Sequence, residues 1–293
     1  MKRLLPPDLK EAAPFLLPLL GFIGAFVLIP VLGAVVNSTL RDVTFLKSEF
    51  AGLGNYAWLA RNPAFWQSVK FTLLFVALSV PLQMLLGIVF ALVLNEKVPL
   101  RGLLRACVLI PWVVPAAVSA RIWELIYNYS FGLANFLWVA TGIPEEPVNW
   151  LGTDAGAFIA LVLADTWKTT PFVTVILLTG LSAIPEDIYL QAQVDGANLF
   201  KRFVKITVPL LKPAIVVALI FRTIDSLRVF DLNYVLTNGG PGGSTTSVSL
   251  HGYQYFLLGD FGYGSAVSVV LFLVALSLTL AYIKIGRIGQ VIQ

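Results

Sequence analysis

The sequence predicts an all-α polytopic membrane protein with six transmembrane helices, and two observations support that prediction. The first is composition: 58% of the 293 residues are hydrophobic and 12% are charged, and the mean hydropathy is +0.84, which is typical of a chain that lies mostly in lipid. The second is segment length, because a bilayer core requires roughly 20 consecutive apolar residues per helix. Six stretches meet this requirement: Phe15–Val36, Phe71–Leu94, Leu103–Tyr127, Phe158–Gly180, Pro209–Leu236 and Ala266–Ile283.

The N-terminal part divides into a short basic tail, residues 1–13, and the first apolar stretch. That stretch is too long for the apolar region of a secretory signal peptide and lacks a small-residue cleavage site, so we expect it to remain as a transmembrane helix. Residues 14–293 then form one transmembrane domain. Prolines inside later spans each remove a backbone hydrogen bond and permit a kink, which predicts bent helices there; they are Pro81, Pro111, Pro115 and Pro171.

Basic residues outside the spans are concentrated in alternate connections. The tail, the turn 95–102, the segment 184–209 and the C-terminal end carry most of them, whereas the loops 128–156 and 237–263 carry none. The positive-inside rule therefore predicts that both termini and the segment 184–209 are cytoplasmic. Because the net charge of +4 is explained by this topology, it does not indicate nucleic-acid binding.

Ionisable residues lie inside two of the predicted spans. The fourth span carries Asp165 and Lys168, three residues apart and hence on one helix face. The fifth carries a longer set at the same spacing: Arg222, Asp225, Arg228 and Asp231. A charge at the bilayer centre costs about 2.5 to 3.5 kcal/mol even on the most permissive insertion scale, so these side chains must face a polar interior. Two interpretations stay open: the two polar faces line a cavity at membrane depth, or they form ion pairs that hold helices together.

Several classes of function lack the residues that they require. The sequence contains no Gly-x-x-x-x-Gly-Lys-Ser/Thr loop for nucleotide phosphates, so any ATP would have to be hydrolysed by another chain. With one His and one Cys, the chain cannot build a metal site from His and Cys, and it offers no credible Ser/His/Asp or Cys/His arrangement. We therefore expect neither an enzyme nor a bound cofactor or metal.

The segment 184–209 is polar and basic although it lies between two long apolar stretches. It is rich in good helix formers, and Gly196 follows Asp195 directly. Three basic residues precede the next apolar stretch: Lys201, Arg202 and Lys205. This pattern predicts two short helices joined near Gly196, which would form a rigid projection suited to docking against a partner.

The spacing within this segment carries a family resemblance. Its fixed positions are Leu190, Gln191, Ala192, Gly196, Ile206, Val208 and Pro209. The spacing is similar to that of the cytoplasmic loop of membrane subunits of bacterial ABC importers, which reads Glu-Ala-Ala, three residues, Gly, nine residues, Ile-x-Leu-Pro. Leu190 and Gln191 stand where the family usually has Glu and Ala. The resemblance implies the type I ABC importer permease fold and ATPase-coupling contacts at Leu190, Gln191, Ala192, Asp195, Gly196 and Ala197.

A longer stretch, Asp165 to Pro241, resembles the larger membrane subunit of maltose importers. It ends in Leu236-Thr237-Asn238-Gly239-Gly240-Pro241, which that subunit shares, and Trp167-Lys168-Thr169-Thr170-Pro171-Phe172 looks closer to the first permease of trehalose importers. In that family this subunit holds the sugar. The resemblance implies sugar contacts at Asp165, Lys168, Thr169, Phe172, Arg222, Asp225, Ser226 and Val229. Carboxylates and guanidinium groups suit sugar hydroxyls, and the balance of charge argues against phosphate or sulfate as cargo.

Together these features predict a permease subunit of an ATP-binding-cassette sugar importer, which forms half of the pathway for a disaccharide such as trehalose or maltose. The implied partners are a second homologous permease, an ABC ATPase dimer that carries ATP and Mg, an extracytoplasmic sugar-binding protein and membrane lipid, with no nucleic acid. The predicted location is the bacterial plasma membrane, multi-pass, with both termini cytoplasmic. The alternative is an ion-coupled secondary transporter using Asp165 and Asp225, which predicts inverted repeats; the sequence shows no convincing internal repeat.

Overall fold

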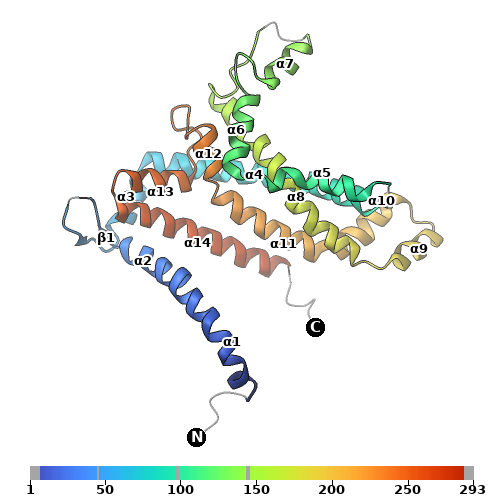
Figure 1. The fold of residues 1–293 in the computed structure, drawn as a ribbon, viewed down its shortest axis with the longest axis horizontal. Helices are drawn as coiled ribbons and strands as arrows, with labels where there is room; N and C mark the ends of the chain where they lie inside the picture. The colour runs from blue at the N-terminus through green and yellow to red at the C-terminus, as the bar shows by residue number, and fades with distance from the viewer. Residues whose placement is uncertain (1–6, 45, 97–98, 143–145, 287–293) are drawn as a thin grey trace. The chain divides into compact units, whose positions relative to one another are not determined.

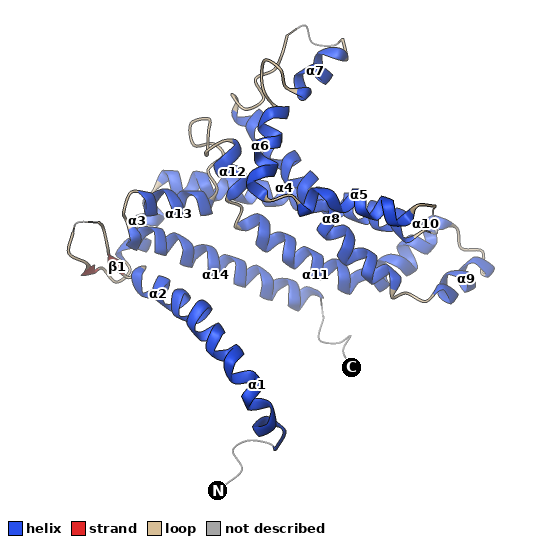
Figure 2. Ribbon diagram, viewed as in Figure 1, coloured by secondary structure: helices blue, strands red, loops and turns tan. Residues whose placement is uncertain are grey.

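The computed structural model describes residues 7–44, 46–96, 99–142 and 146–286. Over these residues it is helical apart from loops and one antiparallel pair of short strands, β1 (Leu40–Arg41) and β2 (Glu49–Phe50), which confirms the predicted all-α class (Figures 1 and 2). The helices are α1 (Pro7–Ile23), α2 (Ile29–Asn37), α3 (Gly54–Arg61), α4 (Pro63–Asn95), α5 (Arg101–Val113), α6 (Ala116–Ile126), α7 (Leu133–Ala140), α8 (Asp154–Ser182), α9 (Glu186–Val194), α10 (Leu199–Arg202), α11 (Val208–Leu227), α12 (Asp231–Leu236), α13 (Val248–Leu257) and α14 (Phe261–Gly286), with π-helical turns at Gly24–Leu28 and Phe203–Thr207.

Five helical segments among the described residues are long and apolar enough to cross a membrane. They are Pro14–Asn37, Pro63–Asn95, Asp154–Ser182, Leu199–Leu227 and Phe261–Ile285. The pair α5 and α6 passes the same test when taken as one broken span. These five segments and the broken pair correspond in order to the six predicted spans. The predicted tail 1–13 is only partly described: residues 1–6 lie outside the described range, and α1 already begins at Pro7.

The third predicted span, Leu103–Tyr127, is not one helix. It is divided into α5 and α6, which meet at an angle of 94°. Val114 adopts an extended conformation and Pro115 caps the start of α6. Helical geometry is disfavoured for the residue before a proline, and proline has no N–H to donate. The sequence predicted the position of the bend correctly, but the helix is broken there and not merely kinked.

The fifth predicted span, Pro209–Leu236, is wrong at both ends. Its helix begins at Leu199, passes through the π-helical turn and ends at Leu227, and Asp231 starts the separate helix α12. Asp231 therefore does not continue the helix face that carries Arg222 and Asp225. The break is explained by packing against residues that are distant in sequence. Leu232 and Leu236 of α12 are buried in a core cluster with residues of α4, α6 and α8.

The chain forms two compact units. The first contains the described residues up to Asn62 together with Gly252–Val270. Its α3 is fixed by a polar and aromatic contact, in which the Asn62 amide donates to the hydroxyls of Tyr255 (3.1 Å) and Tyr263 (3.0 Å). No residue in the most apolar part of Pro14–Asn37 is buried.

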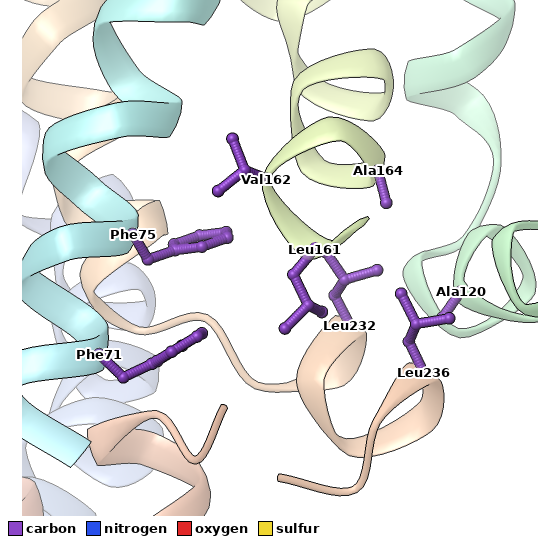
Figure 3. Packing of buried hydrophobic residues seen from close by; sticks show 8 residues of the cluster. All are labelled: Phe71, Phe75, Ala120, Leu161, Val162, Ala164, Leu232 and Leu236. Carbon is purple, nitrogen blue, oxygen red and sulfur yellow. The ribbon is translucent and has the colours of Figure 1, made fainter. Parts of the chain in front are cut away.

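The second unit contains Pro63–His251 and the chain from Leu271 onward. Its centre is formed by α4, α8 and α11, which pack against one another, with α5 along α8 and α12 against α6. One core cluster joins α4, α6, α8 and α12 (Figure 3): Phe71, Phe75, Ala120, Leu161, Val162, Ala164, Leu232 and Leu236. A second joins α4, α8 and α11: Val80, Met84, Ala91, Val173, Leu177, Leu181, Leu211 and Ala218.

Two glycines set how closely these three helices approach. A Cβ atom added to Gly87 on α4 would lie 2.5 Å from Cγ1 of Val173 on α8. A Cβ added to Gly180 on α8 would lie 2.7 Å from Cβ of Ala214 on α11. Small residues at membrane helix interfaces allow this close backbone packing, which replaces the hydrophobic driving force that is missing in lipid. The same close packing brings polar side chains of the three helices within hydrogen-bond distance.

Candidate functional site

Helices α4, α8 and α11 bring four polar side chains together inside the second unit. Gln83 comes from α4, Asp165 from α8, and Arg222 and Ser226 from consecutive turns of α11. We call these four residues the buried polar cluster, because their exposed fractions are 0%, 8%, 3% and 1% respectively. Such burial of two charged groups at membrane depth requires that each be paired and hydrogen-bonded.

Hydrogen bonds satisfy the buried polar cluster from within. The Gln83 amide donates from Nε2 to Oδ2 of Asp165 (2.7 Å) and accepts at Oε1 from Nε of Arg222 (2.8 Å). The Arg222 guanidinium also donates from Nη2 to Oδ2 of Asp165 (3.4 Å) and to Oγ of Ser226 (3.1 Å). Gln83 thus bridges the two charges, and the cluster ties three helices together.

The cluster continues toward the surface through Asp225 and Arg228. Nη1 of Arg222 lies 3.4 Å from Oδ2 of Asp225, whose Oδ1 accepts from Nη2 of Arg228 at 2.8 Å. Side-chain exposure rises along this path, from 4% for Arg222 to 37% for Asp225 and 70% for Arg228. Two arginines and two aspartates balance in charge, so the path offers hydrogen-bonding groups to a neutral polar ligand without net attraction for an ion.

The remaining predicted sugar contacts lie around this path in different settings. Lys168 is half-buried, and none of the described carboxylates lies within ion-pair distance of its ammonium group. The Thr169 hydroxyl donates to the backbone carbonyl of Asp165 (2.6 Å). Phe172 packs between two aromatic rings, Trp112 of α5 and Phe221 of α11, with ring centroids 5.7 Å and 5.9 Å away. Val229 packs against the first core cluster.

The structure shows which ion pairs these charged residues form. Asp225 pairs with Arg228 at the three-residue spacing, whereas Asp165 pairs with Arg222 of another helix and not with Lys168 of its own. Gln83 was missed. The signal was present, since Thr72, Ser79 and Gln83 recur on one face of the otherwise apolar span Phe71–Leu94, and all three are buried. A polar stripe on a membrane helix indicates an interior face.

The segment 184–209 contains the short helix α9 and the first turns of the long helix Leu199–Leu227, so the predicted break near Gly196 is confirmed and the predicted second short helix is wrong. Helix α9 ends at Val194, Gly196 has a left-handed conformation with φ of 75°, and α10 begins at Leu199. The Asn198 side chain caps α10 by accepting from the backbone N–H of Lys201 (2.8 Å). Gly196 is suited to this turn because residues with a Cβ rarely adopt positive φ. We call residues 184–209 the projecting segment.

Apolar side chains are unusually exposed at the tip of the projecting segment. The exposed fractions are 89% for Val194, 78% for Leu199 and 76% for Phe200, against 53% for Leu190. The predicted contact set contained Leu190 but not the three more exposed residues. A cluster of exposed apolar residues on a short, capped helix pair is typical of a surface that another protein covers. Behind the tip, the hydroxyls of Tyr189 and Thr207 are hydrogen-bonded at 3.1 Å, which joins α9 to the helix that continues into α11.

Comparison with known proteins decides the family. A family described as "Binding-protein-dependent transport system inner membrane component" matches residues 83–287. The chain belongs to this family. The matched range contains the buried polar cluster, its extension to Arg228 and the whole projecting segment. The protein is accordingly a multi-pass membrane permease, which is a component of a transport system and not an enzyme.

Named relatives and solved structures agree with this assignment. The chain is 54% identical over 273 residues to the trehalose/maltose transport system permease protein MalF of Thermococcus litoralis, covering 93% of this chain and 92% of that protein. It is 39% identical over 240 residues to the trehalose transport system permease protein SugA of Mycobacterium tuberculosis, covering 81% and 75%. Its fold is that of a chain in a bacterial ABC transporter involved in the import of the acidic polysaccharide alginate, with a TM-score of 0.82, 23% identity and coverage of 96% and 97%.

Proposed function

We propose that this permease forms half of the translocation pathway of an ATP-binding-cassette importer for a disaccharide such as trehalose or maltose. One observation carries the proposal: 54% identity, extending over 93% of the chain, to a permease named for trehalose and maltose. The pairing of Asp165, Arg222, Asp225 and Arg228 supports it, because these four charges balance and a neutral sugar gains hydrogen bonds from charged groups.

The sugar contacts that we propose are divided by exposure. Lys168, Thr169, Phe172 and Asp225 are partly accessible and would contact the sugar, with Phe172 offering an aromatic face. Asp165, Arg222 and Ser226 are buried and hydrogen-bonded to one another, so they would act by positioning Asp225. Val229 is half-buried at the helix break and would limit the space available.

The projecting segment is the proposed contact with the ATPase. Its coupling contacts would be Leu190, Gln191, Ala192, Asp195, Gly196 and Ala197, extended by the exposed Val194, Leu199 and Phe200. ATP and Mg would bind on the ATPase dimer, a second homologous permease would complete the pathway, and an extracytoplasmic sugar-binding protein would deliver the cargo. The distribution of basic residues supports a plasma-membrane orientation with both termini and the projecting segment in the cytoplasm.

The test is uptake by the purified assembly in proteoliposomes, with labelled trehalose and maltose supplied together with the binding protein. We expect uptake only when ATP is present on the side of the membrane where the ATPase is bound. We expect no uptake when a proton or sodium gradient replaces ATP. Uptake that follows an ion gradient and ignores ATP would support the secondary-transporter alternative. If the assembly takes up a different compound with ATP and accepts neither sugar, the ATP-driven mechanism stands and the proposed disaccharide cargo is wrong.

Asp225→Asn is expected to lower sugar uptake at subsaturating sugar by roughly 10- to 100-fold, because a hydrogen bond to a charged group contributes about 1.5 to 3 kcal/mol. The change keeps the shape of a side chain that is partly exposed, so the thermal unfolding temperature should change little. The measurement is initial uptake rate against sugar concentration. Glu124→Gln is the matched control, since Glu124 is an exposed carboxylate paired with Arg121 on α6; equal losses in both variants would remove Asp225 from the sugar site.

A further inference from the structure

A cavity of about 290 Å³ lies in the second unit, between the end of α4, the middle of α5 and the last turns of α8. Leu94, Val108, Leu109 and Leu178 contribute apolar walls, and among the described residues Arg105 is the one charged side chain that lines it. No residue of the buried polar cluster or of its extension to Arg228 lines this cavity. It is therefore separate from the proposed sugar contacts.

Arg105 differs from the arginine one turn before it. Arg101 donates from Nε to the Leu94 carbonyl (2.7 Å) and from Nη2 to the Asn95 carbonyl (3.3 Å), so its guanidinium caps the end of α4. The Nε atom of Arg105 is buried and has no hydrogen-bond partner among the described residues. A buried, unsatisfied donor of a charged group is costly, which indicates that an acceptor occupies the site when the protein is in its membrane.

The hydroxyl groups that line the cavity already donate their protons to backbone carbonyls. The hydroxyl of Thr179 donates to the Val175 carbonyl (2.9 Å), and the hydroxyl of Ser182 donates to the Leu178 carbonyl (2.8 Å). No acidic side chain of the part of the chain that the structure describes lines the cavity. The Arg105 guanidinium therefore provides the positive charge and an unused donor at Nε, while the remaining walls are mainly apolar. This combination favours an occupant with an anionic end and a hydrocarbon chain.

The position of the cavity agrees with the chemistry of such an occupant. Arg105 follows Arg101, the first residue of α5, by four residues, which is about 6 Å along a helix axis and near the depth where lipid headgroups meet acyl chains. Ser182 is the last residue of α8 and lies two residues before the start of the projecting segment. Basic pockets between membrane helices at this level bind anionic lipid headgroups.

We propose that this cavity binds one anionic phospholipid. Its phosphate accepts hydrogen bonds from the Arg105 guanidinium, and one acyl chain packs against Leu109 and Leu178. Because Ser182 lies two residues before the projecting segment, the bound lipid sits close to the base of that segment and stabilises the packing of the ends of α4 and α8 against the middle of α5.

The test is the binding of phosphatidylglycerol by the full chain, purified in nanodiscs of phosphatidylcholine with and without phosphatidylglycerol. Retained lipid is measured by native mass spectrometry, and thermal unfolding is measured in the same samples. We expect one phosphatidylglycerol per chain and a higher unfolding temperature in its presence. Arg105→Gln should weaken this binding about tenfold, because the charged donor is lost. Thr179→Phe, which keeps Arg105 and fills the cavity, should abolish it.

Arg121→Gln is the matched control, because Arg121 is an exposed arginine that is already paired with Glu124. It should bind phosphatidylglycerol as the unmodified chain does. The proposal is overturned if Arg105→Gln and Thr179→Phe retain full binding, if phosphatidylcholine is retained equally well, or if Arg121→Gln loses as much. Stabilisation by inorganic phosphate alone, dependent on Arg105, would identify a free anion as the occupant and overturn the lipid.

Discussion

Arg222→Met is expected to destabilise the permease by about 3 to 5 kcal/mol, the range measured when one partner of a buried ion pair is removed. The variant leaves Asp165 buried with its charge uncompensated and leaves Oε1 of Gln83 without its donor. Because these contacts join α4, α8 and α11, we expect a lower thermal unfolding temperature and less folded protein in the membrane. The measurement is thermal unfolding of the purified chain, followed as the fraction of protein that stays monodisperse after heating.

Two further variants separate this structural role from simple loss of charge. Arg228→Met removes an arginine from the exposed end of the same path, where an ion pair contributes about 0 to 1 kcal/mol, and should leave the unfolding temperature nearly unchanged. The double variant Arg222→Met with Asp165→Leu removes both charges and should recover part of the lost stability. Normal stability in Arg222→Met, combined with lost uptake, would contradict the positioning role and favour direct contact with the sugar.

Phe200→Asp is expected to disconnect the permease from its ATPase. Large apolar side chains at the centre of an interface typically contribute 2 kcal/mol or more, which is about a 30-fold change in affinity. Phe200 is 76% exposed beside Leu199 and Val194, so a carboxylate there would be forced into an apolar contact while the permease itself loses no internal packing. We expect loss of ATP-dependent uptake and of ATPase co-purification, with an unchanged unfolding temperature for the isolated chain.

Phe136→Asp is the matched control, since Phe136 is similarly exposed, at 71%, but lies on α7 in the loop predicted to face the other side of the membrane. It should leave ATPase co-purification intact. Retention of the ATPase by Phe200→Asp, or its loss in both variants, would remove the tip of the projecting segment from the interface.

Features with a local cause could be predicted from the sequence. Apolar length located the spans, and the Asp195-Gly196 pair located the turn between α9 and α10, because a positive φ is a property of a single residue. The bend at Pro115 was also predictable in place. Its 94° angle was not, since the direction that a broken helix takes depends on what its second half packs against.

Features decided by distant parts of the chain could not be predicted in this way. The helix break after Leu227 depends on the burial of Leu232 and Leu236 beside Phe71 and Leu161, which are remote in sequence. The partner of Asp165 lies 57 residues away, whereas spacing arguments consider only neighbours on one helix. A polar residue within a membrane helix indicates that it has a hydrogen-bond or ion-pair partner. Which residue is the partner depends on how the helices pack.

The continuous helix from Leu199 to Leu227 has a thermodynamic consequence. Phe200 lies near one end and Asp225 near the other, roughly 37 Å apart at 1.5 Å per residue. Suppose that the nucleotide state changes the affinity of the ATPase for the tip, and that a bound ligand changes the orientation of Asp225. The ATPase-binding equilibrium and the ligand-binding equilibrium then act on the same helix. Linkage then requires reciprocity: whatever factor the nucleotide imposes on ligand affinity, the ligand imposes on the affinity of the ATPase for this helix.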